Sequence, residues 1–108
     1  MPRYLVQASY APSAAAALVS NPQDRTAGVR ALHEKLGGKL ESLEFCLGDY
    51  DVVIICSFPD DTTAAAAALA ICAAGHLKAH KTTRLLSAQE FMKAQQLAHG
   101  NGYQPPKA

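Results

Sequence analysis

The feature that most constrains the fold is the sequence VVIICSF at residues 52–58. Successive side chains of a strand point to opposite faces, so Val53 and Ile55 would lie on one face. Val52, Ile54 and Cys56 would lie on the other. Neither set suits contact with water. The run therefore predicts a central strand that is covered on both faces.

The rest of the chain alternates between strand-like and helix-like patterns. Strands are predicted at residues 3–10, 40–47, 52–58 and 77–86. Helices are predicted at residues 12–36, with a break near Pro22 and a second start at Asn21, and at 61–75 and 88–98. The order βαββαβ predicts an α+β fold, a ferredoxin-like plait with a four-stranded antiparallel sheet and an extra C-terminal helix. We expect one domain over residues 1–98 and a flexible tail over 99–108.

Several helix ends carry specific signals. The pair Gly37-Gly38 is typical of a helix exit, and so is Gly75. Asp60 is a predicted N-cap, and Ser87 with Glu90 has the spacing of a capping box. These signals set the boundaries of the predicted elements.

The plait leaves one face of its sheet without helices, and either face of the third strand would present apolar side chains there. Even a few hundred Å² of apolar area left in water costs several kcal/mol at roughly 25 cal/mol per Å². We therefore expect self-association through this face, most simply as a two-fold dimer. The alternative is that the final helix, with Phe91, Met92 and Leu97, folds over the face within one chain.

Composition excludes several functions. Ten Lys and Arg against nine Asp and Glu give a net charge of +1, so no basic field favours nucleic acid or a membrane surface. No segment approaches the roughly 18 apolar residues of a membrane span, and a cytoplasmic location is expected. The third strand also lacks the exposed aromatic residues with which plait-type RNA binders stack bases.

The chain offers no clear metal or cofactor signal. Cys46, Cys56 and Cys72 form no C-x-x-C pair and are interpreted as reduced core thiols. His76 and His80 are four residues apart, which in a strand is more than about 12 Å. We predict no metal site and no cofactor.

Five residues are candidates for binding a ligand. Asp49 and Asp51 flank Tyr50 in the turn before the third strand, although aspartates also stabilise turns by bonding to backbone amides. Arg25 precedes Val29 by four residues and could bind an anion between helix and sheet, or pair with an acid such as Asp51. His33 would lie at the border of the helix's buried stripe.

The stretch LGDYDVVII resembles the motif of the GYD-domain family, small bacterial proteins named for a Gly-Tyr-Asp sequence; here Gly48, Tyr50 and Asp51 carry the match. The resemblance extends over about residues 3–92, including YLVQASYAPSAAAAL and PDDTTAAAAALAICAAG. It implies a ferredoxin-like fold of the dimeric α+β barrel kind and implies no reaction.

The sequence thus favours a self-associating α+β module with space for a small ligand between helices and sheet. The alternative is a cofactor-free enzyme of the dimeric α+β barrel type, with monooxygenase or isomerase chemistry. Its catalytic residues are unknown, and its site would lie around Tyr50, Asp51, Arg25 and His33. The expected partners are a second copy of the chain and a small molecule.

Overall fold

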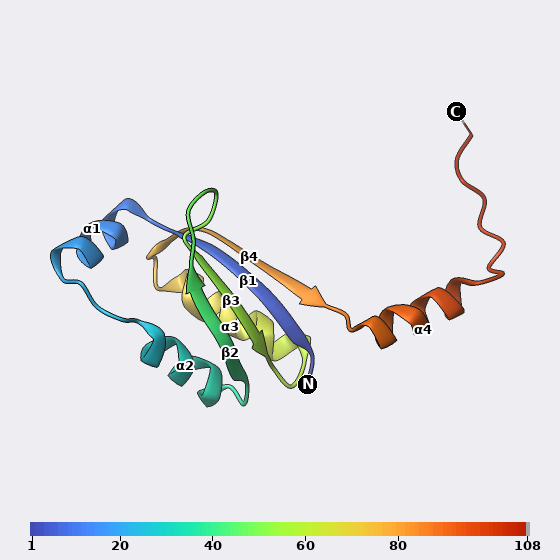
Figure 1. Cartoon of the computed structure of the whole chain (residues 1–108), viewed down its shortest axis with the longest axis horizontal. Helices are drawn as coiled ribbons and strands as arrows, with labels where there is room; N and C mark the ends of the chain where they lie inside the picture. The colour runs from blue at the N-terminus through green and yellow to red at the C-terminus, as the bar shows by residue number, and fades with distance from the viewer. Residues whose placement is uncertain (108) are drawn as a thin grey trace.

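The computed structural model describes residues 1–107, which contain four strands and four helices (Figure 1). In chain order they are β1 (Arg3–Tyr10), α1 (Pro12–Ser20), α2 (Thr26–Lys35), β2 (Lys39–Phe45), β3 (Val52–Ser57), α3 (Asp61–Ala73), β4 (Leu77–Leu85) and α4 (Ala88–Ala98). Within these residues no helix has the length and apolar character needed to cross a membrane.

The four strands form one antiparallel sheet in the order β2-β3-β1-β4. The predicted α+β plait is confirmed, with β1 and β3 at its centre. Helix α2 packs against β2 and helix α3 against β4. In Figure 1 α3 lies behind the strands and α2 lies beside β2, so the face of the sheet opposite α3 is turned toward the reader.

The two central strands align their apolar side chains on the face that the helices cover. Tyr4 is paired with Cys56, and Val6 with Ile54. These four side chains are at most 8 % exposed and form the middle of the core. The alternation in the sequence predicts both strand faces correctly because the side-chain period of a strand is two residues.

The segment between β1 and β2 differs from the prediction. Asn21 is the C-cap of α1, Pro22 lies outside any helix, and α2 begins at Thr26. The predicted second start at Asn21 is therefore wrong. The carboxylate of Asp24 accepts a hydrogen bond from the backbone N–H of Thr26 at 2.9 Å, which satisfies one free donor where the helix begins.

The predicted caps of the later helices are confirmed. Asp60 accepts the Thr63 hydroxyl at 2.7 Å and the Thr63 backbone N–H at 2.8 Å, and these two bonds hold the pKa of the Asp60 carboxyl below its ordinary value. Ser87 and Glu90 form the reciprocal capping box at the start of α4. Gly75 leaves α3 with a φ of 77°, a conformation that glycine adopts without strain.

Helix α4 lies apart from the sheet, beyond the end of β4 (Figure 1). Every residue of α4 is exposed, including Phe91, Met92 and Leu97. The alternative in which this helix covers the open face within one chain is therefore wrong. Leu5, Val53 and Ile55 remain half-buried on that face. Residues 99–107 of the predicted tail are exposed and contain no helix or strand, and residue 108 lies outside the described residues.

Candidate functional site

The core between helices and sheet is closed at the end where Phe58 lies. His33 is 2 % exposed, and its ring stacks on Phe58 with 5.0 Å between centroids. Its Nδ1 lies 2.8 Å from the carbonyl oxygen of Val29, which can only accept, so Nδ1 carries the proton. The predicted border position of His33 is wrong, because α2 turns this ring inward against the core.

Tyr4 and Cys56 complete the closed end. The Tyr4 hydroxyl donates a 2.6 Å hydrogen bond to Asp61. Burial, and to a smaller extent this hydrogen bond, raise the pKa of Tyr4 to about 12. Burial likewise raises the pKa of the Cys56 thiol to about 11. Cys56 is a core thiol as predicted, whereas Cys46 is half-buried and Cys72 is exposed on α3, so the prediction of a core position fails for Cys72.

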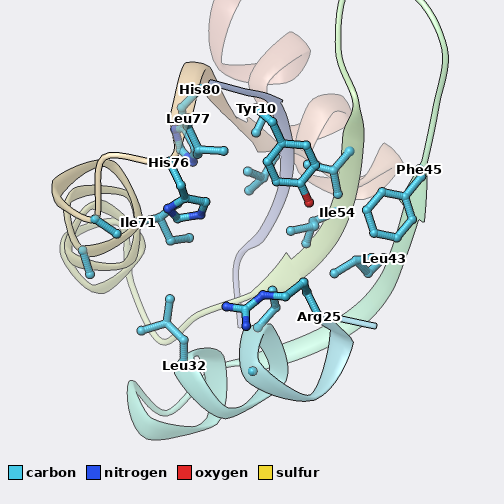
Figure 2. A pocket seen from close by; sticks show the side chains of 17 residues that line it. Tyr10, Arg25, Leu32, Leu43, Phe45, Ile54, Ile71, His76, Leu77 and His80 are labelled. Carbon is cyan, nitrogen blue, oxygen red and sulfur yellow. The ribbon is translucent and has the colours of Figure 1, made fainter. Parts of the chain in front are cut away.

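The opposite end of the same layer holds a cavity of about 230 Å³ (Figure 2). It is bounded by α2, α3 and the covered face of the sheet, and its lining is mainly apolar. The principal apolar side chains are those of Val6, Leu32, Leu43, Ile54, Ile71 and Leu77.

Small residues account for the cavity. Ala8 lies on its floor, Gly28 lies on the α2 side, and Ala70 and Ala74 lie on the α3 side. Alanine has one side-chain carbon and glycine has none. The helices and the sheet therefore leave a space between them that larger side chains would fill. At the closed end, by contrast, Ala64 and Ala67 border a void of about 10 Å³, too small for a ligand.

Four polar side chains also line the cavity, those of Tyr10, Arg25, His76 and His80. In Figure 2 the guanidinium of Arg25, the hydroxyl of Tyr10 and the ring of His76 are directed into the space between the helices and the strands. An adjoining cavity of about 290 Å³ shares Tyr10, Arg25 and His76 and extends beneath α1. The polar groups therefore lie where the two cavities meet.

The electrostatics of this region favour the neutral forms of Tyr10 and His80. Burial raises the pKa of Tyr10, with Asp51 adding to the rise and Arg25 opposing it, so the phenol keeps its proton at neutral pH. Burial lowers the pKa of His80, which favours the neutral imidazole. The lining contains no carboxylate.

The turn between β2 and β3 is tied to the end of β1. The Asp51 carboxylate accepts the backbone N–H of Tyr10 at 2.9 Å, and the carbonyl of Asp49 accepts the Ser9 hydroxyl at 2.9 Å. The carbonyl of Tyr50 accepts the Cys46 thiol at 3.1 Å. These contacts hold the strand end from which Tyr10 points into the cavity.

The structure thus separates the five predicted ligand residues. Arg25 lines the cavity; Tyr50, Asp49 and Asp51 lie in the adjoining turn, and His33 lies in the closed core. Arg25 forms no ion pair with Asp51, whose carboxylate bonds to the β1 backbone instead. The sequence-based search missed Tyr10, His76 and His80. The alternation that places Tyr10 on the face of Val6 and Ala8 was the available signal.

Within residues 1–107, no group of three or more His, Cys, Asp or Glu side chains is placed to hold a metal ion. The cavity also contains no cysteine or serine that could act as a nucleophile. What the arrangement offers is an apolar space with a guanidinium, a neutral phenol and two imidazoles at one side. An apolar hollow with a few polar groups at one side is the typical composition of a small-molecule site.

Comparison with known proteins supports the fold and gives the family. No curated protein matched the chain. A solved structure, the crystal structure of MtbAldR, superposes with a TM-score of 0.52 at 12% sequence identity. The match covers 80% of this chain and 52% of that one, so this chain spans about half the length of MtbAldR, and the likeness concerns the fold alone. The family model of the GYD domain matches residues 4–94, and the chain therefore belongs to the GYD-domain family.

Proposed function

We propose that this protein binds a small, mainly apolar molecule in the cavity between α2, α3 and the sheet. The observation that carries the proposal is the 230 Å³ space itself, in a domain whose remaining core is closed. Protein interiors are packed to the density of organic crystals, so an unfilled space of this size is unusual. Ligand sites are typically such apolar hollows with a few polar groups at one side.

The size of the space limits the ligand. Typical sites for drug-sized molecules measure roughly 300–1,000 Å³, and this cavity lies just below that range. A ligand whose apolar part is a bicyclic aromatic ring or a medium-length alkyl chain would therefore fit the cavity. We use the neutral compound 2-naphthalenemethanol as a probe of the apolar space.

Matched alanine-to-leucine substitutions test the proposal. Ala8 and Ala67 are both 3 % exposed, but Ala8 faces the cavity and Ala67 faces the closed core. Ala8→Leu fills the space and is expected to remain folded, with loss of 2-naphthalenemethanol binding by titration calorimetry. Ala67→Leu overpacks the core and is expected to lower the free energy of unfolding by about 1–3 kcal/mol.

Two results would count against the ligand cavity. The first is that Ala8→Leu destabilises the protein as much as Ala67→Leu, because the space would then not exist in solution. The second is that folded Ala8→Leu binds the probe with the affinity of the unmodified protein.

We also propose that the protein self-associates through the face of the sheet that carries Leu5, Val53 and Ile55. These residues lie at the centre of the face, which no helix of residues 1–107 covers. The register places Glu44, Val53, Gln7 and Lys81 in one row across the sheet, with the acid on the outer strand β2 and the base on the outer strand β4. The two edges of the face therefore have complementary charge.

This row supports a particular dimer. If two sheets pack face to face about a two-fold axis parallel to the strands, β2 of one copy lies over β4 of the other. Glu44 then faces Lys81 of the partner subunit, and the symmetry repeats the contact. The apolar residues at the centre would supply most of the association energy, and the charged pairs would set the orientation.

A charge exchange tests the dimer. Glu44→Lys is expected to raise the dissociation constant about tenfold or more in analytical ultracentrifugation, because it places like charges opposite each other twice. The double variant Glu44→Lys with Lys81→Glu is expected to recover most of the loss. A monomer mass for the unmodified protein at micromolar concentration would rule out the dimer, and absence of recovery would rule out this orientation.

A further inference from the structure

Arg25 is the only cationic side chain of Lys or Arg type that lines the cavity, and it is held at the point where α2 begins. Its carbonyl accepts the backbone N–H of Val29 at 3.1 Å, which anchors the residue to the first turn of the helix. Gly28 lies next to the guanidinium: a Cβ built there would be 3.8 Å from the Nη2 atom of Arg25. The glycine therefore leaves this side of the guanidinium unobstructed.

The guanidinium has no internal counterion. The ion pairs among residues 1–107 involve Arg3 and Arg84, and Arg25 takes part in none of them. Tyr10 lines the same cavity, and the charge of Arg25 acts to lower the pKa of its phenol against the larger effect of burial. An arginine that extends only to reach water would direct its head group away from the cavity, whereas Figure 2 shows the head group turned into it.

We propose that the natural ligand is an apolar monocarboxylate, with its carboxylate held by Arg25 and its apolar body inside the cavity. This inference rests on the proposed function and adds the chemical class of the ligand. A planar guanidinium offers two parallel N–H donors that match the two oxygens of a carboxylate. The Tyr10 hydroxyl, directed into the same space, is a neutral donor for the same head group.

The surroundings favour one negative charge. Arg25 is the only lysine or arginine in the lining, and the lining contains no carboxylate to repel an anion. A phosphate carries close to two negative charges, whereas the lining supplies one guanidinium to balance them. The walls beyond the head group are formed by aliphatic residues such as Leu32, Ile54 and Ile71, which exclude a second charged end.

The experiment compares two probes that share one apolar body. Binding of 2-naphthoate and of 2-naphthalenemethanol to the full chain is measured by titration calorimetry, for the unmodified protein and for two variants. Arg25→Gln removes the charge at the cavity. Arg30 is exposed, as Arg25 is, but it lies within α2 and does not line the cavity, so Arg30→Gln removes the same charge and serves as the matched control. Circular dichroism checks that both variants are folded.

We expect the unmodified protein to bind 2-naphthoate about tenfold more tightly than the alcohol, the effect of one charge-assisted contact at a partly exposed site. Arg25→Gln should abolish this preference and leave the affinity for the alcohol unchanged, and Arg30→Gln should change neither. Equal affinity for the two probes, or equal losses in both variants, would overturn the carboxylate proposal while leaving the apolar site intact. Failure of both probes to bind would overturn the proposed function as well.

Discussion

Gly38→Ala is expected to lower the free energy of unfolding by roughly 3 kcal/mol, the upper end of the range for overpacked positions. A Cβ at this position would lie 2.5 Å from the carbonyl oxygen of Ser57 and 2.6 Å from the ring of Phe58. One of these neighbours is backbone at the end of the central strand β3, and the other is a ring that is 2 % exposed. Neither can move without separating β2 from β3 or opening the core.

The neighbouring glycine is the matched control. Gly37 has a φ of 76°, and a Cβ there would be 3.5 Å from Pro59, an ordinary contact. Gly37→Ala should therefore cost only about 1–2 kcal/mol, for the left-handed backbone. Chemical denaturation of both variants measures the difference. If Gly37→Ala proved as damaging as Gly38→Ala, the close approach of β2 to Phe58 would be wrong.

His33→Ala is expected to cost about 2–4 kcal/mol of unfolding free energy, because it removes a buried ring and leaves a space beside Phe58. His33→Phe keeps a ring at this position and loses the hydrogen bond to the carbonyl of Val29, so it should cost less, about 1–2 kcal/mol. Denaturation curves for the two variants give both values.

The same pair of variants separates the structural role of His33 from the predicted ligand role. If His33→Ala kept the stability of the unmodified protein but lost binding of 2-naphthoate, the residue would belong to the ligand site. We expect His33→Phe to be folded and to bind the probe, since His33 lies at the closed end of the layer and outside the cavity lining.

The fold is largely predictable because its main signals are local. The apolar run of β3 indicates a central strand, and β3 lies inside the sheet between β2 and β1. Asp60 and Ser87 bond to amides within three residues, so their effect does not depend on the rest of the chain. The start of α2 was mislocated because Pro22 suits a first helical position. In the structure the Asp24 carboxylate bonds to the backbone N–H of Thr26 instead, and α2 begins at Thr26.

The candidate site is less predictable because its parts come from separate elements. Tyr10 ends β1, Arg25 precedes α2, and His80 reaches the cavity through its position opposite Ala8 in the register of β1 and β4. No local pattern encodes that register. The sequence did indicate Arg25, because its spacing from Val29 places it on the inner side of the helix. The sequence did not predict that His33 is buried. The helical pattern places His33 at the edge of the apolar stripe, and a small rotation of the helix about its axis is enough to move such a residue into the core.

The turn that carries the family motif makes structural hydrogen bonds of the kind that was the alternative to a ligand-binding role for its aspartates. Asp51 bonds to the backbone N–H of Tyr10, and Ser9 bonds to the carbonyl of Asp49, so the turn fixes the end of β1. Its contribution to the cavity is the position of Tyr10. The motif residues Tyr50 and Asp51 themselves do not line the cavity.

The central claim is that the space between α2, α3 and the sheet is the ligand site, and its most direct test is the location of a bound probe. Intermolecular nuclear Overhauser effects between 2-naphthoate and methyl-labelled protein would give that location. We predict contacts with the methyl groups of Val6, Leu32, Ile54 and Ile71, which line the cavity. Contacts confined to Leu5, Val53 and Ile55 on the open face, or to Leu97 on α4, would contradict the account.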